Sequence, residues 1–141
     1  MFSELKKYKS NDHFFFSGDE PLNEVCNAPK NGSGVYYILE LSHGNIEIVY
    51  IGCSGKVSND GAIKHRKNGL FERIVNGKQF GAARHISWAK KIEEEGIDAL
   101  DVYWFETYAD DIQDSPLYVE SLIMQQFLNI YGRLPKWNKE F

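Results

Sequence analysis

The sequence predicts a mixed α+β domain organised around a β-hairpin, and three observations support this prediction. Residues 35–42 and 46–52 are two runs of β-branched and aromatic side chains, separated by a His-Gly-Asn turn. Residues 99–107 are aromatic enough for a central strand of the same sheet. Residues 116–131 carry apolar side chains at the spacing of a buried helical stripe. Strands and helices are therefore both expected.

Length and composition predict one domain. The 141 residues are enough to bury a core, with residues 1–33 expected as an N-terminal extension packed on or leading into a domain at 34–141. Cys26 and Cys53 lie far apart and form no ligand cluster, so a structural zinc site and a disulfide framework are not expected. No apolar run has the length of a signal or membrane segment. We expect a reduced, cytoplasmic protein.

Charge is unevenly distributed along the chain. The net charge is −4, yet residues 56–91 contain nine basic side chains against two acidic ones. A cationic segment in an acidic protein favours a phosphate-bearing ligand held at one face, rather than a wide non-specific grip on DNA. A solvated surface on which charges happen to cluster is the alternative interpretation.

The hairpin carries a tyrosine near the outer end of each strand, Tyr36 and Tyr50. Strand side chains alternate between faces, so the pairing register decides whether the two tyrosines face the same way. A three-residue loop at 43–45 would place both on one face, and a two-residue loop would separate them. We predict the same face. Ordinary packing of aromatic residues in a sheet is the alternative for either tyrosine alone.

Residues 53–69 form a long link with three glycines and no sustained period, which is typical of a functional loop. A short helix follows at 70–77, closed by Gly77 and carrying Arg73 between apolar positions. A second helix is expected within 80–95, ended by Gly96. Its apolar stripe is predicted at His85, Trp88, Ala89 and Ile92, and its basic residues Arg84, Lys90 and Lys91 are expected to face solvent or the DNA backbone.

The last helix has the clearest boundaries. Ser115 is the expected cap, Pro116 the first helical residue, and Gly132 the end. Its buried stripe is predicted at Val119, Leu122, Ile123, Phe127 and Ile130. Glu120 borders this stripe; an acidic residue near a helix start is ordinary, because it favours the helix dipole.

These elements together resemble one enzyme family. Gly34-Val35-Tyr36 and Tyr50-Ile51-Gly52 resemble the two triplets of the GIY-YIG endonucleases, with Val35 where isoleucine is usual. Arg73 resembles the family's arginine on the first helix after the second triplet. Glu120, within Tyr118-Val119-Glu120, resembles its metal-binding glutamate, and Asn138 resembles its closing asparagine. The resemblance covers residues 34–141, and the order of all these features makes it far more specific than the triplets alone.

Two departures from the family pattern leave alternatives open. The link before Arg73 is longer than in compact members, so Arg66 is a rival for the catalytic arginine. Many members also carry a histidine or tyrosine one turn after the arginine, where this chain has Gly77. The candidate substitutes are Lys64, His65, Lys78 and His85.

The resemblance implies a small central antiparallel sheet of three main strands flanked by helices. It implies a metal-dependent endonuclease that hydrolyses DNA phosphodiester bonds with Mg²⁺ or Mn²⁺ on Glu120. Tyr36 would be the base, Arg73 would stabilise charge in the transition state, and Tyr50 and Asn138 would orient neighbouring groups. The residues expected to bind nucleic acid are Lys64, His65, Arg66, Lys67, Lys78 and Arg84.

Specificity would come from loops such as 53–69, from homo-oligomerisation or from a protein partner. Two other functions remain open at the level of sequence. One is a non-catalytic nucleic-acid-binding module that retains the fold, and the other is a protein-interaction domain.

Overall fold

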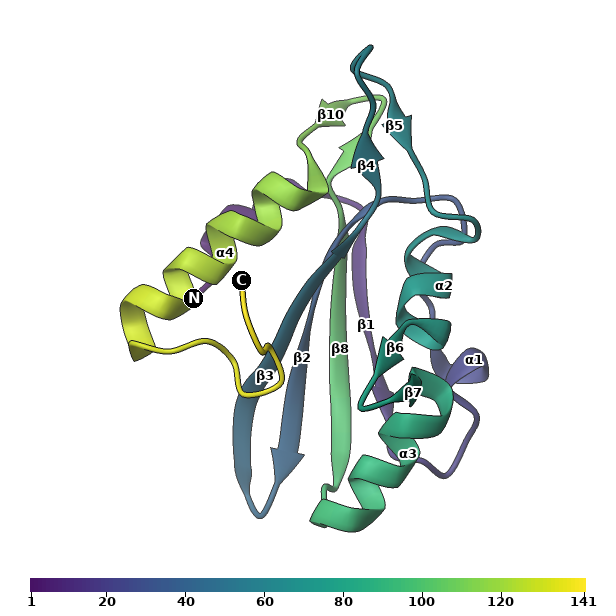
Figure 1. The fold of residues 1–141 in the computed structure, drawn as a ribbon, viewed down its shortest axis with the longest axis vertical. Helices are drawn as coiled ribbons and strands as arrows, with labels where there is room; N and C mark the ends of the chain where they lie inside the picture. Colours follow the sequence, from purple (N-terminus) through teal and green to yellow (C-terminus); the bar gives the residue numbers. More distant parts are fainter.

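A four-stranded antiparallel sheet forms the centre of the protein in the computed structural model, which describes residues 1–141 (Figure 1). Its strands are ordered β1-β8-β2-β3, with β1 at Asn11–Phe16, β2 at Gly34–Ser42, β3 at Asn45–Ser54 and β8 at Ala99–Glu106. The predicted α+β class is confirmed. The three expected strands are joined by β1, so the N-terminal extension supplies an edge of the sheet.

Helices cover both faces of this sheet (Figure 1). On one face lie α1 (Leu22–Val25), α2 (Gly69–Asn76) and α3 (Arg84–Glu95), packed in one core of 18 buried residues. On the other face lie α4 (Pro116–Tyr131) and the 3₁₀ helix η1 (Ser3–Lys7), packed in a second core of eight. No helix is both long enough and apolar enough to cross a membrane.

Three two-stranded hairpins extend the central fold. At one end, β4 (Lys56–Val57) pairs with β5 (Ile63–Lys64), close to the pair formed by β9 (Tyr108–Ala109) and β10 (Ile112–Gln113) (Figure 1). The Tyr108 hydroxyl donates to the Gly61 carbonyl and links the two pairs. The third hairpin joins β6 (Lys78–Gln79) to β7 (Ala82–Ala83). The second helix therefore begins at Arg84, inside the predicted range 80–95.

The helix boundaries were predicted better than the buried stripes. Ser115 caps α4, Pro116 begins it, and Gly132 ends it in the left-handed region at φ +69°. The stripe on α4 instead consists of Val119, Ile123, Met124 and Phe127, whereas Ile130 is 58% exposed and Leu122 is half-buried. On α3, His85 is exposed, so its place in the predicted stripe was also wrong.

The hairpin has a different register from the one expected. Ser42 pairs with Asn45 across a two-residue turn, in which His43 and Gly44 adopt φ +53° and +77°. A β-bulge then inserts Val49 between the pairs Leu39–Ile48 and Ile38–Tyr50. Because the extra residue reverses the alternation of faces, the bulge places Tyr36 and Tyr50 on the same face, as a three-residue loop would have done.

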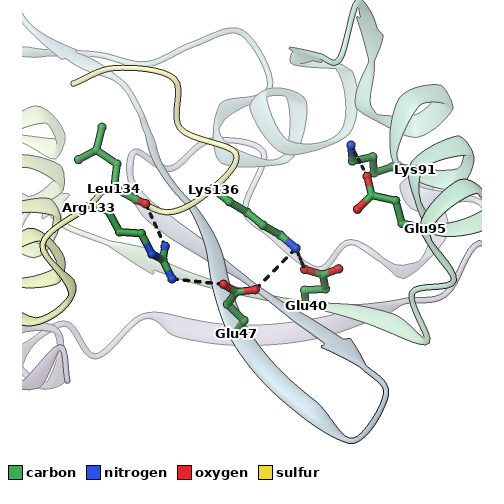
Figure 2. Close-up of polar contacts among 7 residues, drawn as sticks. All are labelled: Glu40, Glu47, Lys91, Glu95, Arg133, Leu134 and Lys136. Carbon is green, nitrogen blue, oxygen red and sulfur yellow. Dashed lines mark hydrogen bonds and ion pairs between the residues drawn. The ribbon is translucent and has the colours of Figure 1, made fainter.

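The C-terminal segment closes over the exposed edge of β3. Lys136 Nζ lies 2.5 Å from Glu40 Oε2 and 3.6 Å from Glu47 Oε2, and Arg133 Nη2 lies 3.4 Å from Glu47 Oε1 (Figure 2). The Trp137 N–H donates to the Val49 carbonyl over 2.9 Å, so the bulge has a hydrogen-bond partner. An edge strand presents unpaired backbone groups, and this segment satisfies part of them.

Candidate active site

Tyr36 and Tyr50 point to the same face of the hairpin, as predicted. Their ring centroids are 6.1 Å apart, and the Tyr36 ring lies directly over Gly52. A Cβ atom on Gly52 would come within 2.6 Å of the Tyr36 hydroxyl oxygen. Gly52, in the second triplet, thus has to be a glycine because the ring of Tyr36, in the first triplet, occupies the space of a side chain. Tyr36 is fully buried, and burial raises the pKa of the half-buried Tyr50 phenol.

Asn138 fixes the backbone beside Tyr50. The Ile51 N–H donates to Asn138 Oδ1 over 3.1 Å, and Asn138 Nδ2 donates to the Ile51 carbonyl over 3.0 Å. The side chain therefore imitates a neighbouring strand at the residue after Tyr50. Asn138 positions the second triplet rather than contributing a free polar group to the site.

Arg73 projects from α2 toward both tyrosines. The helix is anchored through the buried Leu70 and Ile74, and its first free amides are satisfied by the preceding loop. The Leu70 N–H donates to the Gly32 carbonyl and the Phe71 N–H to the Pro29 carbonyl, each over 3.1 Å. The Tyr36 phenol raises the pKa of the Arg73 guanidinium, outweighing the opposite effect of partial burial. Arg73 is thus a half-buried cation on a fixed helix.

Glu120 approaches from the other face of the sheet. It lies on α4, near Arg73 and the Cys53 thiol. Burial raises the pKa of the Glu120 carboxyl group, and a hydrogen bond with Cys53 and the charge of Arg73 offset part of that rise. Because β3 is an edge strand, residues from α2 and α4 can meet beyond it. We call Tyr36, Tyr50, Arg73 and Glu120 the inner set.

A basic hollow of about 480 Å³ adjoins the inner set. Its lining includes Arg73, Cys53 and the chain from Ser54 to Lys56. Its remaining charged lining consists of Lys64, His65 and Arg66, all exposed, and it contains no acidic side chain. The His65 ring nitrogen Nδ1 lies 2.6 Å from the hydroxyl oxygen of the buried Ser33. We call Lys56, Lys64, His65 and Arg66 the basic rim.

Three of the expected nucleic-acid-binding residues fall outside this hollow. Lys67 and Lys78 are exposed but do not line it. Arg84 is only 1% exposed, and its Nη1 donates to the Tyr36 hydroxyl over 2.8 Å. The expectation that Arg84 faces solvent or DNA was therefore wrong, because the side chain turns inward beneath the tyrosines.

The donor set fits one hard divalent ion of the Mg²⁺ type. Such ions are commonly held by one or two carboxylates and complete their shell with water and substrate phosphate oxygens. Glu120 is a half-buried carboxylate near Arg73 and Cys53, which line the basic hollow, and a phosphate there would supply the missing oxygens. No group of three or more His, Cys, Asp or Glu side chains lies close enough together to hold a metal ion without substrate.

Sequence reasoning missed Cys53 and the role of Arg84. Cys53 directly follows the second triplet. Because strand side chains alternate between faces, the sequence could have placed Cys53 on the face of the sheet that does not carry Tyr36 and Tyr50. Burial raises the pKa of its thiol to about 12, which keeps it protonated beside Glu120. No sequence spacing indicates that Arg84 turns inward.

Comparisons with known proteins add no relative. No family model, no curated protein and no solved structure matches this chain. The function of the site is therefore inferred from its own residues and geometry.

Proposed function

We propose that this protein is a metal-dependent endonuclease that hydrolyses DNA phosphodiester bonds through a GIY-YIG-type active site. The convergence of the inner set carries the proposal. Its four side chains lie on β2, β3, α2 and α4 and come together at one sheet edge, where the half-buried Arg73 lies near the other three. Packing alone does not need a half-buried carboxylate near a half-buried guanidinium next to an open basic hollow.

The chemistry follows from these groups. A phosphodiester in the hollow would lie with its charged oxygens toward Arg73, whose planar fork can donate two hydrogen bonds to the phosphoryl group. Tyr36, in its phenolate form, accepts a proton from water as the water oxygen bonds to phosphorus. The bond from phosphorus to the 3′ oxygen breaks, and that oxygen takes a proton from solvent. Arg73 stabilises the extra negative charge of the five-coordinate transition state.

The remaining residues bind and orient. A Mg²⁺ or Mn²⁺ ion on Glu120 would supply Lewis-acid polarisation of the phosphoryl oxygens. Tyr50, as a phenol, donates a hydrogen bond toward the phosphate or the attacking water, and Asn138 holds the strand that carries it. The basic rim would hold the phosphates that flank the reactive one, and this contact would position DNA without reading its sequence.

Cleavage of a DNA panel tests the proposal. Purified protein would be incubated with linear, supercoiled, flapped and four-way DNA, with Mg²⁺, with Mn²⁺ or with chelator. We expect metal-dependent nicking with mapped 3′-hydroxyl ends, and Glu120→Gln as control should not cut. DNA binding without cleavage of any substrate would instead favour a non-catalytic nucleic-acid-binding module, and absence of binding at low salt would contradict both.

A further inference from the structure

Arg84 is the most deeply buried charged side chain near the inner set. It begins α3 and is 1% exposed. Its Nη1 donates to the Tyr36 hydroxyl over 2.8 Å and to the Arg73 carbonyl over 2.9 Å, and its Nε donates to Gln79 Oε1 over 3.0 Å. One guanidinium group thus joins the first tyrosine to the helix that presents Arg73.

No carboxylate lies within ion-pair distance of Arg84. Its charge is stabilised instead by three aromatic rings, with Cζ 5.3 Å from the centroid of Tyr36, 5.2 Å from that of Tyr50 and 5.4 Å from that of Trp88. The Arg73 carbonyl adds the partial negative charge near the C-terminal end of α2. A buried cation without a counter-ion is costly, so a position that needed only packing would be better served by an apolar side chain.

The space for this guanidinium is provided by Gly77. A Cβ atom at Gly77 would lie 3.1 Å from Arg84 Nη1 and 2.2 Å from the Arg73 carbonyl oxygen. Any larger residue there would displace the helix end or the arginine. Gly77 lies one turn after Arg73, so the absence of a side chain at this position lets Arg84 reach both the helix end and Tyr36.

We propose that Arg84 is a positioning residue that holds the Tyr36 oxygen and the end of α2 in the geometry needed for phosphodiester cleavage. This inference rests on the proposed function. The guanidinium restrains the oxygen that must take a proton, and the same group fixes the backbone of Arg73. A fully buried cation at this point also adds a fixed positive potential toward a bound phosphate, without contacting it.

A double-mutant cycle in cleavage tests this proposal. The variants are Arg84→Met, which keeps the length but removes charge and donors, Tyr36→Phe, which removes only the oxygen, and their combination. We expect Arg84→Met to lower kcat by about tenfold to a hundredfold with KM nearly unchanged, since a hydrogen bond to a charged group is lost. In the Tyr36→Phe background the same change should cost clearly less, because only the hydrogen bonds of Arg84 to the Arg73 carbonyl and Gln79 Oε1 are then lost. Arg84→Lys should recover part of the rate.

Trp88→Phe is the matched control. Trp88 is buried on the same helix and packs on the same guanidinium, but its Nε1 donates to Gln79 Oε1 and not to the Tyr36 oxygen. Its effect on kcat should be equal in the wild-type and Tyr36→Phe backgrounds. Equal losses from Arg84→Met in both backgrounds would overturn the proposal that Arg84 holds the Tyr36 oxygen.

Equilibrium unfolding of the wild type, the two single variants and the double variant gives a measurement that does not depend on activity. If Arg84 holds the Tyr36 oxygen, the two substitutions should be coupled by about tenfold or more in the unfolding constant. Additive effects would contradict the proposal even in an active enzyme. If the wild-type protein cuts no DNA, the proposed function fails, while this cycle still decides whether Arg84 restrains Tyr36.

Discussion

The inner set and the basic rim carry charges of different kinds. Arg73 and Glu120 are half-buried and project from two helices that pack on opposite faces of the sheet. The charged side chains of the rim are exposed. Lys56 and Lys64 lie on the short strands β4 and β5, and His65 and Arg66 follow β5 in the link to α2. A group that stabilises a transition state must be held to a fraction of an ångström, whereas a group that attracts phosphate need not be. We therefore propose a role in chemistry for the inner set and a role in binding for the basic rim.

The same contrast distinguishes the two candidate arginines. Arg73 and Arg66 both line the hollow, but Arg73 reaches Tyr36 from a helix anchored at both ends. Arg66 lies in the exposed link before that helix. We therefore propose Arg73 as the catalytic arginine and Arg66 as a binding residue.

The largest expected effect belongs to Glu120→Gln. Removal of the carboxylate takes away the one acidic ligand that we propose for a divalent ion, and cleavage should fall by about a thousandfold or more, because a bound ion contributes several kcal/mol of charge stabilisation. DNA binding, measured by fluorescence anisotropy, should change little. Full activity in the variant would remove Glu120 from the inner set.

The second-largest effect on cleavage is expected for Arg73→Ala. Loss of one preorganised donor should lower kcat by about two to three orders of magnitude, with the Kd for DNA nearly unchanged. Arg73→Lys should also perform poorly, because a point charge cannot reproduce the planar fork. Single-turnover cleavage and anisotropy measure the two quantities. If Arg66→Ala is inactive but binds and Arg73→Ala remains active, the two roles have been assigned the wrong way round.

Arg66→Ala should act mainly on binding. Neutralising a DNA phosphate releases counterions, so the slope of log Kobs against log salt should flatten by about one unit for each phosphate that the variant no longer neutralises. Lys64, Lys67 and Lys78 should share this dependence to different degrees, with Lys78, which lies away from the hollow, as the weaker case. A titration between low and moderate salt measures it, and a wild-type affinity that does not change with salt would contradict the proposed role of the rim.

The smallest effect concerns stability without metal. Burial raises the pKa of Glu120, so the folded protein binds that proton more tightly than the unfolded chain. Stability therefore falls as pH rises from below the ordinary carboxyl pKa to above the raised value, and the loss persists at neutral pH. Glu120→Gln should accordingly raise the Tm of the metal-free protein at pH 7 and reduce its pH dependence. A lower Tm would indicate that the carboxylate stabilises the fold.

The elements that carry much of the candidate site were predictable from sequence, because they have strong local signals. Arg73 belongs to a short helix closed by Gly77, and Glu120 to a helix with a cap, an N1 proline and a terminal glycine. Turn and cap chemistry acts over a few residues, so it can be recognised along the chain. Apolar spacing predicted the existence of α4 correctly but placed Ile130 in its buried stripe, because the spacing does not show where the sheet ends.

The shared face of Tyr36 and Tyr50 was predicted correctly for the wrong reason. The turn has two residues, which by itself would have put the two tyrosines on opposite faces, and the bulge at Val49 places them on one face again. That bulge is supported by the Trp137 N–H, from the C-terminal segment, so the hairpin sequence alone does not determine the register.

The sequence by itself determined the elements, their order and the residue types available for chemistry, since propensity and capping are local. Tertiary structure alone decided which cations are buried. Arg84 and Arg66 are both basic residues in the same cationic segment, but one is 1% exposed under three aromatic rings and the other is open to solvent. Burial depends on contacts between distant segments, and those contacts form only when β2, β3, α2 and α3 pack together.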